Sequence, residues 1–316
     1  MSELEAHFKF EWKRAADLPY NVTEYPQAVV INEKVYVGGR IASSSTDDAM
    51  PVVLVYDSYV NEWSTLPPYG CVYFAMAAVN NRLVVIGGRD VNGYNLTAHL
   101  GVWNEKWTKP FAPMPTARCS ASATTYIKWL VVVGGRSLDL DMKLSNVEIL
   151  DTMSNQWYSC APLPRPSSSI SLTATVGNMC YALGGYTSGH NGSKKVFSVC
   201  LDDLISQAIS QPTGAMALSI SSPWHSLPDT PLAFSTAVCL DGALFAVGGI
   251  QDSRLQPGVS IYLYQPSRKT WVQLRDILPH GRERCTCVAL TDRKALIAGG
   301  DYRSREVDIA EIMYDT

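Results

Sequence analysis

A glycine pair that follows a short apolar stretch recurs six times along the chain. The stretches read VYVGG, VVIGG, VVVGG, YALGG, FAVGG and LIAGG, with first glycines at positions 38, 87, 134, 184, 248 and 299. Successive pairs are 49, 47, 50, 64 and 51 residues apart, so the period is close to 50 residues. A chain with this period is built from repeated units, each of which buries its faces against its neighbours.

Two further features repeat in phase with the glycines. A tryptophan precedes each pair by 24 to 28 residues, and these tryptophans are Trp12, Trp63, Trp107, Trp157, Trp224 and Trp271. A turn that contains proline follows each tryptophan, as in LPPY or APLPRP. The third unit divides into four short strands, at about 119–126, 129–135, 145–151 and 155–160. We therefore expect antiparallel four-stranded units, in which a tryptophan ring covers each interface between units and the glycines supply positive φ at a kink.

This combination of glycine pair, tryptophan and proline turn resembles the kelch repeat over residues 8–316. The resemblance implies one all-β domain, residues 1–316, folded as a six-bladed kelch β-propeller. The expected blades span about 25–66, 72–111, 118–160, 168–227, 232–274 and 283–316, the last completed by a strand at 8–14. That N-terminal strand, around Phe10–Arg14, should pair with Val307–Tyr314 and so close the ring without an exposed edge. The low-charge insertion 206–222 in blade four is expected to be a surface loop.

Composition argues against several classes of function. The formal net charge of −3 lacks the basic excess of a nucleic-acid binder. No apolar run approaches the roughly 20 residues that span a bilayer, and the N-terminus has no apolar signal-peptide core. We expect a cytoplasmic protein whose eight cysteines are reduced, without metal or cofactor.

The sequence contains no catalytic motif. The five histidines fall in different blades without metal-ligand spacing, and no nucleophile elbow, zinc-protease motif or phosphate loop is present. We therefore expect a binding protein rather than an enzyme. The alternative is a propeller enzyme that acts on a small sugar-like acid, because such a site needs only scattered arginines and acids and leaves no motif.

A binding site is expected on one face of the ring. Connections between the second and third strands, and from one blade to the next, should emerge together there. This face should collect the residues after the glycine pairs, Arg40, Arg89, Arg136, Tyr186, Ile250 and Asp301, and those after the proline turns, Tyr25, Tyr73, Phe74, Arg118, Ser168, Ser169, Phe234 and Arg284. Arginine binds carboxylates bidentately and aromatic rings give rigid contact area, so the predicted ligand is a protein or a short acidic peptide.

The sequence leaves two interpretations of these arginines open. They could bind a ligand, or they could pair with nearby loop acids, namely Asp47, Asp48, Asp90, Asp139 and Asp141. The resemblance to kelch-like substrate adaptors of cullin ubiquitin ligases implies the first, because those propellers read short peptides with the same two loop positions. Their BTB and BACK regions are not part of this sequence. Actin binding, another habit of kelch proteins, implies a cytoskeletal scaffold instead.

Overall fold

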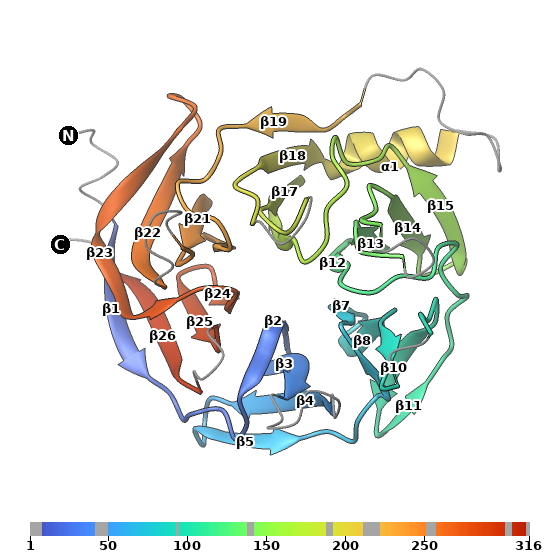
Figure 1. Ribbon diagram of the computed structural model, residues 1–316, viewed down its shortest axis with the longest axis horizontal. Coiled ribbons are helices and arrows are strands. Elements are labelled where there is room, and N and C mark those ends of the chain that lie inside the picture. The colour runs from blue at the N-terminus through green and yellow to red at the C-terminus, as the bar shows by residue number, and fades with distance from the viewer. Residues whose placement is uncertain are drawn as a thin grey trace.

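The computed structural model describes residues 8–41, 50–92, 95–137, 142–187, 192–210, 222–250, 257–300 and 305–313. Six four-stranded antiparallel sheets surround a central axis (Figure 1). Each sheet is one blade, whose first strand lies nearest the axis and whose last strand lies at the periphery. The predicted six-bladed propeller is therefore confirmed.

The first three blades follow one another along the chain. Blade 1 consists of β2 (Val22–Ile31), β3 (Lys34–Ile41), β4 (Met50–Asp57) and β5 (Glu62–Thr65). Blade 2 consists of β7 (Ala75–Val79), β8 (Arg82–Ile86), β10 (Leu100–Asn104) and β11 (Lys106–Thr108), with a short extra ribbon of β6 (Cys71–Val72) and β9 (Arg89–Asp90). Blade 3 consists of β12 (Ser122–Tyr126), β13 (Trp129–Val133), β14 (Val147–Asp151) and β15 (Gln156–Cys160).

The remaining three blades complete the circle. Blade 4 consists of β16 (Ser171–Val176), β17 (Met179–Leu183), β18 (Val196–Cys200) and β19 (His225–Leu227), with helix α1 (Leu201–Ser210) between its last two strands. Blade 5 consists of β20 (Thr236–Leu240), β21 (Ala243–Val247), β22 (Gly258–Gln265) and β23 (Thr270–Arg282). Blade 6 consists of β24 (Thr286–Thr291), β25 (Lys294–Ala298), β26 (Val307–Met313) and β1 (Lys9–Arg14).

The core lies between the blades, and the inner strands are apolar on both faces for that reason. Side chains alternate between the two faces of a strand. In β13, Val131 and Val133 pack into the cluster shared with blade 4. Their neighbours Leu130 and Val132 pack into the cluster shared with blade 2. A strand buried on both faces reads as a continuous apolar run, as WLVVV does.

The N-terminal strand closes the ring as predicted. β1 pairs antiparallel with β26, placing Phe10 opposite Ile312. The backbone N–H of Phe10 donates to the Asp276 carboxylate of β23 at 2.5 Å, and its ring packs edge-on against Phe245 with centroids 5.6 Å apart. The closing strand is therefore fixed to blade 5 as well as to blade 6, although it comes from the far end of the chain.

The repeated tryptophans link each blade to the preceding one. Five of the six indole N–H groups, all but that of Trp12, donate to a backbone carbonyl in the proline turn of the blade before. These bonds, 2.7 to 3.2 Å long, are Trp63 to Ala16, Trp107 to Pro67, Trp157 to Ala112, Trp224 to Ala161 and Trp271 to Pro228. The in-phase spacing of tryptophan and proline turn is explained by this bond between neighbouring blades.

The glycine pairs serve two different needs. In blades 2 to 6 both glycines have positive φ, and a Cβ on Gly134 would lie 2.4 Å from the Ser167 carbonyl oxygen. In blade 1 the pair lies inside β3 without positive φ. There a Cβ on Gly38 would lie 2.2 Å from Met76 Sδ, so the need is close packing against blade 2. The expectation of positive φ is wrong for blade 1 alone.

The insertion in blade 4 differs from the surface loop that we expected from residue 206 onward. Helix α1 begins at Leu201 and includes residues 206–210, while 211–221 lie outside the described residues. Its buried side chains, Leu201, Leu204, Ile205 and Ala208, follow the spacing of one helical face and pack into the cluster between blades 3 and 4. The tyrosine hydroxyl of Tyr126 donates to Asp202 in the first turn at 2.9 Å.

Candidate functional site

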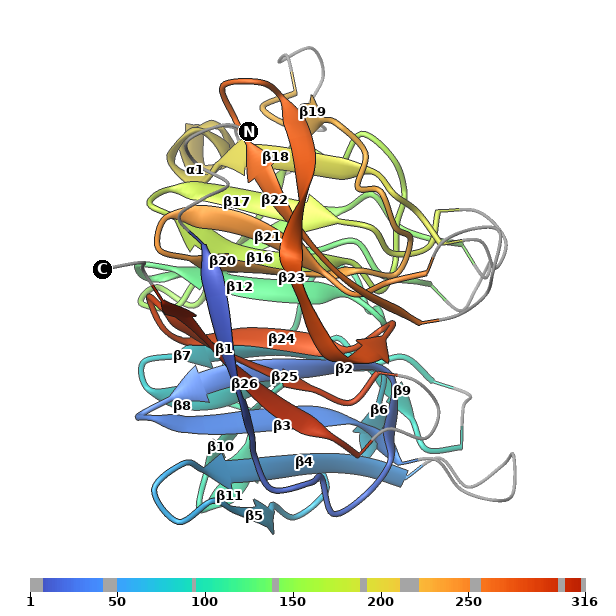
Figure 2. The same ribbon diagram turned by 90° about the vertical axis from the view of Figure 1, so that its left-hand side faces the viewer.

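The two sets of predicted loop residues meet on one face of the propeller, here called the upper face. It carries the ribbon of β6 and β9 and lies opposite the face that carries α1, here called the lower face (Figure 2). Short antiparallel bridges join residues of the first set to the chain segment that carries the second set on the same blade. The bridged pairs are Thr23 with Arg40, Val72 with Arg89, Cys119 with Arg136, Ser168 with Tyr186 and Ala233 with Ile250. In blades 1 to 5 the residue after the glycine pair is thereby fixed beside the connection that enters its own blade.

A ring of left-handed residues follows those bridges around the axis. Tyr73, Ser120, Ser169, Phe234 and Arg284 occupy the same position in blades 2 to 6, with φ between 51° and 58°. Backbone N–H groups link the ring from blade to blade, from Ser120 to the Tyr73 carbonyl at 2.7 Å, from Ser169 to the Ser120 carbonyl at 2.8 Å and from Arg284 to the Phe234 carbonyl at 3.0 Å. The ring therefore holds its side chains at one height.

Large side chains are unusual at such positions. Left-handed backbone favours glycine, asparagine or aspartate, and a bulky residue there costs about 1–3 kcal/mol. Yet Tyr73, Phe234 and Arg284 occupy three of these positions. Residues in a strained backbone conformation cluster at functional sites, where the side chain contributes to binding.

Two arginine–aromatic stacks stand on this ring. The Arg89 guanidinium lies 5.1 Å from the ring centre of Tyr73, and the Arg284 guanidinium lies 4.5 Å from that of Phe234. Phe234 in turn meets Tyr186 edge-on with centroids 5.2 Å apart. Stacking holds a guanidinium in place while leaving its N–H groups able to donate in the plane of the fork. The stacks lie on opposite sides of the axis, in blade 2 and across blades 4 to 6 (Figure 1).

Five of the predicted residues are buried, namely Phe74, Arg118, Ser168, Phe234 and Ile250. Two of them, Arg118 and Phe74, belong to the framework. Arg118 is 0% exposed, and its guanidinium lies 2.6 Å from the carboxylate of Glu148, which is equally enclosed. It also donates to the carbonyls of Gly134 and Asn146, both at 3.1 Å. Phe74 is buried against the second blade and fills the space above Gly38. Both residues support the upper face from below, so neither belongs to the surface that a ligand would meet.

A second buried pair shows that the Arg118 arrangement is a recurring device. Arg282 lies 2.6 Å from Asp308 and donates to the Gly299 and Glu306 carbonyls at 2.7 and 3.0 Å. In both blades an arginine that enters the first strand meets an acid at the second position of the third strand. This pairing was not predicted from the sequence, although the arginine and the acid recur at the same two repeat positions in both blades.

The other predicted residues are placed as follows. Arg40 and Arg136 are half-buried on the upper face, beside Thr23 and Cys119. Ser169 is half-buried in the left-handed ring, whereas Ser168 beneath it is buried. Tyr25 belongs to β2, but its side chain lies outside what the structure describes, as do Asp301 and the loop acids Asp47, Asp48, Asp139 and Asp141. Asp90, the remaining loop acid, accepts a hydrogen bond from Asn95 at 2.8 Å.

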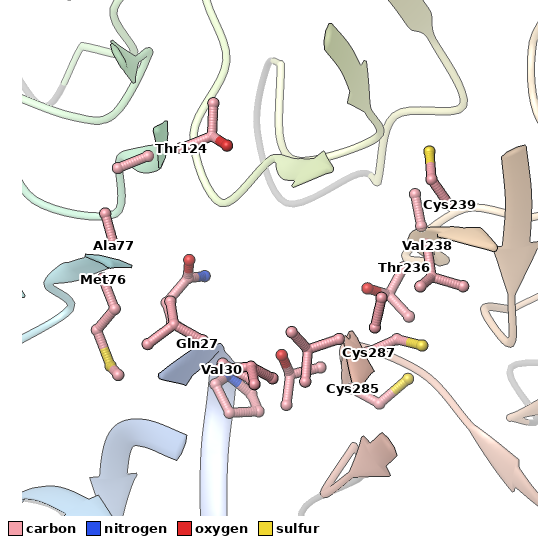
Figure 3. A pocket seen from close by; sticks show the side chains of 18 of the residues that line it. Gln27, Val30, Met76, Ala77, Thr124, Thr236, Val238, Cys239, Cys285 and Cys287 are labelled. Carbon is pink, nitrogen blue, oxygen red and sulfur yellow. The ribbon is translucent and has the colours of Figure 1, made fainter. Parts of the chain in front are cut away.

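A central cavity of about 710 Å³ runs along the axis between the two faces. Ser169, Phe234 and Arg284 line its upper end, and Asp241 and Asp292 line its lower end. Its wall comes largely from the first strands of blades 1, 2, 3, 5 and 6, with Gln27, Thr124 and Thr236 among its polar side chains (Figure 3). The Arg284–Phe234 stack therefore borders the upper end of this cavity, which leaves room for a side chain to enter from above.

The described residues offer few groups of the kind that serve as catalytic nucleophiles or metal ligands. All eight cysteines lie within them and form no disulfide, and burial raises the pKa of the Cys180 thiol to about 12 and that of Cys285 to about 11. A thiol with such a pKa is not a nucleophile near neutral pH. No cluster of three or more His, Cys, Asp or Glu able to hold a metal occurs in the described part of the chain. The same part contains no helix long and apolar enough to cross a membrane.

A closed six-bladed propeller whose loops form a shared upper face is a β-propeller repeat protein. Comparison with known proteins identifies its family. The family model for the KLHDC2/KLHL20/DRC7 kelch-repeats domain matches residues 26–213, more than half of the chain. The chain therefore belongs to the kelch-repeat family, as the resemblance of its repeats implied.

Individual relatives agree with that assignment. The chain is 29% identical over 258 residues to Kelch-like protein 35 of Mus musculus, covering 79% of this chain and 39% of that protein. It is 26% identical over 285 residues to alpha-scruin of Limulus polyphemus, covering 83% of this chain and 28% of that protein. The chain thus spans well under half the length of these relatives. Among solved structures, that of YjhT shares the fold with a TM-score of 0.69 at 14% identity, covering 96% of this chain and 99% of that one.

Proposed function

We propose that this propeller is a non-enzymatic recognition domain that binds a short acidic peptide segment of a partner protein on its upper face. The observation that carries the proposal is the pair of arginine–aromatic stacks, Arg89 on Tyr73 and Arg284 on Phe234, on opposite sides of the propeller axis. Their backbones are fixed by the left-handed ring, so little side-chain freedom is lost when a ligand binds.

The chemistry of the rim favours a peptide over a small molecule. A guanidinium that rests on a ring presents two parallel N–H donors to a carboxylate, and Tyr and Arg are enriched at the energetic centres of protein interfaces. A rim that surrounds an open channel is broad, which suits an extended segment. Arg40, Arg136 and Tyr186 occupy the remaining rim positions and extend the same surface.

The biological role that we propose is recognition of substrates for a cullin ubiquitin ligase. Named Kelch-like relatives that are much longer than this chain support it, since the propeller is only part of each. In this role the rim selects the substrate, and other regions would contact the ligase.

Affinity capture with matched variants tests the proposal. The intact domain is compared with Arg89→Ala/Arg284→Ala, which removes both stacks, and with Arg82→Ala/Arg268→Ala, which removes two exposed arginines from the lower face. Both variants lose the same charge. We expect partners identified by mass spectrometry to be lost with the first variant and kept with the second. Equal partner sets for all three proteins would refute the proposal.

The ligase role has a separate test. Captured partners should carry less ubiquitin in cells when the full-length protein is replaced by its Arg89→Ala/Arg284→Ala variant. Partners that bind through the rim but show unchanged ubiquitylation and abundance would refute the ligase role and leave peptide recognition standing.

A further inference from the structure

An isoleucine occupies a strained turn position on the lower face of blade 3. In blades 1, 2, 4 and 5 the turn between the first two strands begins with a residue at positive φ, and these residues are Asn32, Asn80, Gly177 and Asp241. Asparagine, aspartate and glycine are the residue types that tolerate this left-handed backbone. In blade 3 the same position is Ile127, with φ 55°. A β-branched side chain is strained there.

The Ile127 side chain does not pack into the core. Ile127 is 84% exposed, a larger fraction than for any other large apolar residue among those that the structure describes. Met153, on the turn between the third and fourth strands of the same blade, is 76% exposed. The Lys128 carbonyl accepts from the backbone N–H and the hydroxyl of Thr152, at 3.1 and 2.7 Å, so the two turns lie side by side. Two large apolar side chains are therefore presented to solvent on adjoining turns.

Helix α1 borders these turns with negative charge. The hydroxyl of Tyr126, the residue before Ile127, donates to Asp202 at 2.9 Å, and Asn178 donates to the same carboxylate at 2.8 Å. Both donors are neutral, so they leave the charge of Asp202 uncancelled. Asp203, the next residue of the helix, is exposed, and within the described part of the chain neither acid forms an ion pair.

Lys128, the second residue of the strained turn, is engaged within its own blade. Its ammonium group lies 2.6 Å from the Asp151 carboxylate and 4.8 Å from the ring centre of Trp129. This pair adds no net charge to the surface around it. The surface formed by Ile127 and Met153, here called the blade 3 patch, is therefore apolar at its centre and negative on the side of α1.

The negative side distinguishes between possible occupants of the blade 3 patch. In a symmetric dimer the same patch meets itself, so a second copy would bring its acids toward Asp202 and Asp203, and like charges repel. Anionic lipid headgroups would be repelled for the same reason. A partner segment that carries lysine or arginine beside large apolar side chains is attracted instead. Its apolar side chains cover Ile127 and Met153 while its cations lie against the acids.

We propose that the blade 3 patch binds a segment of a partner protein in which large apolar side chains stand beside lysine or arginine. The patch lies on the opposite face from the arginine–aromatic rim, so this inference goes beyond the proposed function and does not depend on it (Figure 2). The strain at Ile127 is typical of such a surface, because strained backbone conformations cluster at functional sites.

Melting temperatures test whether Ile127 is held at a cost to the fold. Ile127→Asn should raise the melting temperature by about 2 °C, because asparagine tolerates left-handed backbone. Val60→Asn is the matched control. Val60 is 61% exposed on a lower-face turn of blade 1 and is not among the residues with positive φ, so its replacement should leave the melting temperature unchanged. A lower melting temperature for Ile127→Asn would overturn the inference, since the side chain would then serve the fold.

Three matched peptide libraries test binding. Each has the same randomised flanks, and its fixed core holds two leucines with two lysines, two leucines with two glutamines, or two serines with two lysines. Glutamine removes the cation without adding an acid that the rim could bind. We expect the intact domain to bind the leucine–lysine library about threefold more tightly than the leucine–glutamine library. The advantage over the serine–lysine library should be about tenfold.

Variants test whether that binding occurs at the blade 3 patch. Ile127→Asn/Met153→Ser should abolish the preference for leucine over serine, and Asp203→Asn should reduce the preference for lysine over glutamine. Arg89→Ala/Arg284→Ala should change neither preference, because the rim lies on the other face.

Two results would overturn the inference at this stage. The first is equal binding of the three libraries, or preferences that persist in Ile127→Asn/Met153→Ser. The second is a dimer on size-exclusion chromatography that this double variant converts to a monomer, because the occupant of the patch would then be a second copy of the chain.

Discussion

Replacement of Arg118 by alanine should destabilise the propeller severely, although the residue lies in a loop next to the proposed binding surface. The substitution removes one member of an ion pair that is almost fully excluded from water. It leaves the Glu148 carboxylate buried with Thr116 Oγ1 as its remaining donor, at 2.6 Å. An uncompensated buried charge is among the few single changes that threaten a whole domain.

The magnitude follows from what Arg118 contacts. Besides Glu148, it donates to the carbonyls of Thr116, Gly134 and Asn146, which join the loop before β12 to the second and third strands of the blade. Breaking a buried ion pair from one side costs about 3–5 kcal/mol. The lost hydrogen bonds act in the same direction, so we expect the free energy of unfolding to fall by at least about 3 kcal/mol.

Urea denaturation followed by tryptophan fluorescence would measure this loss. The exposed pair Lys195–Asp229, 2.8 Å apart, provides the control, because Lys195→Ala should cost less than about 1 kcal/mol. The double variant Arg118→Met/Glu148→Leu removes both charges and should recover at least half of the loss. A decrease below about 1 kcal/mol for Arg118→Ala would refute the structural role given to this pair.

Three further predictions concern the framework. Gly134→Ala should destabilise the protein by at least about 1 kcal/mol more than Gly177→Ala in the same urea assay. Both glycines have φ near +62°, but only a Cβ on Gly134 would meet a carbonyl oxygen, at 2.4 Å. Equal losses would mean that backbone strain alone requires glycine. Deletion of residues 1–14 should leave β26 as an open edge and cause aggregation on size-exclusion chromatography, and a monomeric truncation with an unchanged melting temperature would contradict the closure. Iodoacetamide at pH 8 should modify Cys180 only after unfolding, because burial raises the pKa of its thiol to about 12; modification of the native protein, seen by peptide mass spectrometry, would contradict the packing between blades 3 and 4.

Much of this fold could be predicted because the same sequence pattern recurs six times along the chain. The glycine pairs and the tryptophans fix the number of blades, and an N-terminal segment that reads as a fourth strand leaves closure as the only way to complete blade 6. The limits of the prediction lie where a repeat position departs from the consensus. The glycines of blade 1 satisfy close packing against Phe74 and Met76, a tertiary demand that no local pattern shows.

The binding surface was less accessible to sequence reasoning. The position of a residue on the upper face could be inferred from the repeat, but its exposure could not, because an arginine after a proline turn (Arg118) and one after a glycine pair (Arg89) both read as loop residues. Arg118 points inward because it forms an ion pair with Glu148 on the third strand of its blade, whereas Arg89 stacks on the ring of Tyr73. Helix α1 was not predicted, although Leu201, Leu204, Ile205 and Ala208 have helical spacing, because the low charge of the segment from residue 206 onward indicated a loop.

Hydrogen–deuterium exchange with a captured partner peptide would show where that peptide binds. We predict protection of backbone amides in the upper-face segments 72–74, 89–90, 119–120 and 282–286, together with unchanged exchange in the lower-face turns 126–129 and 152–154 and in α1. Protection confined to those lower-face segments would contradict the assignment of the arginine–aromatic rim as the recognition site.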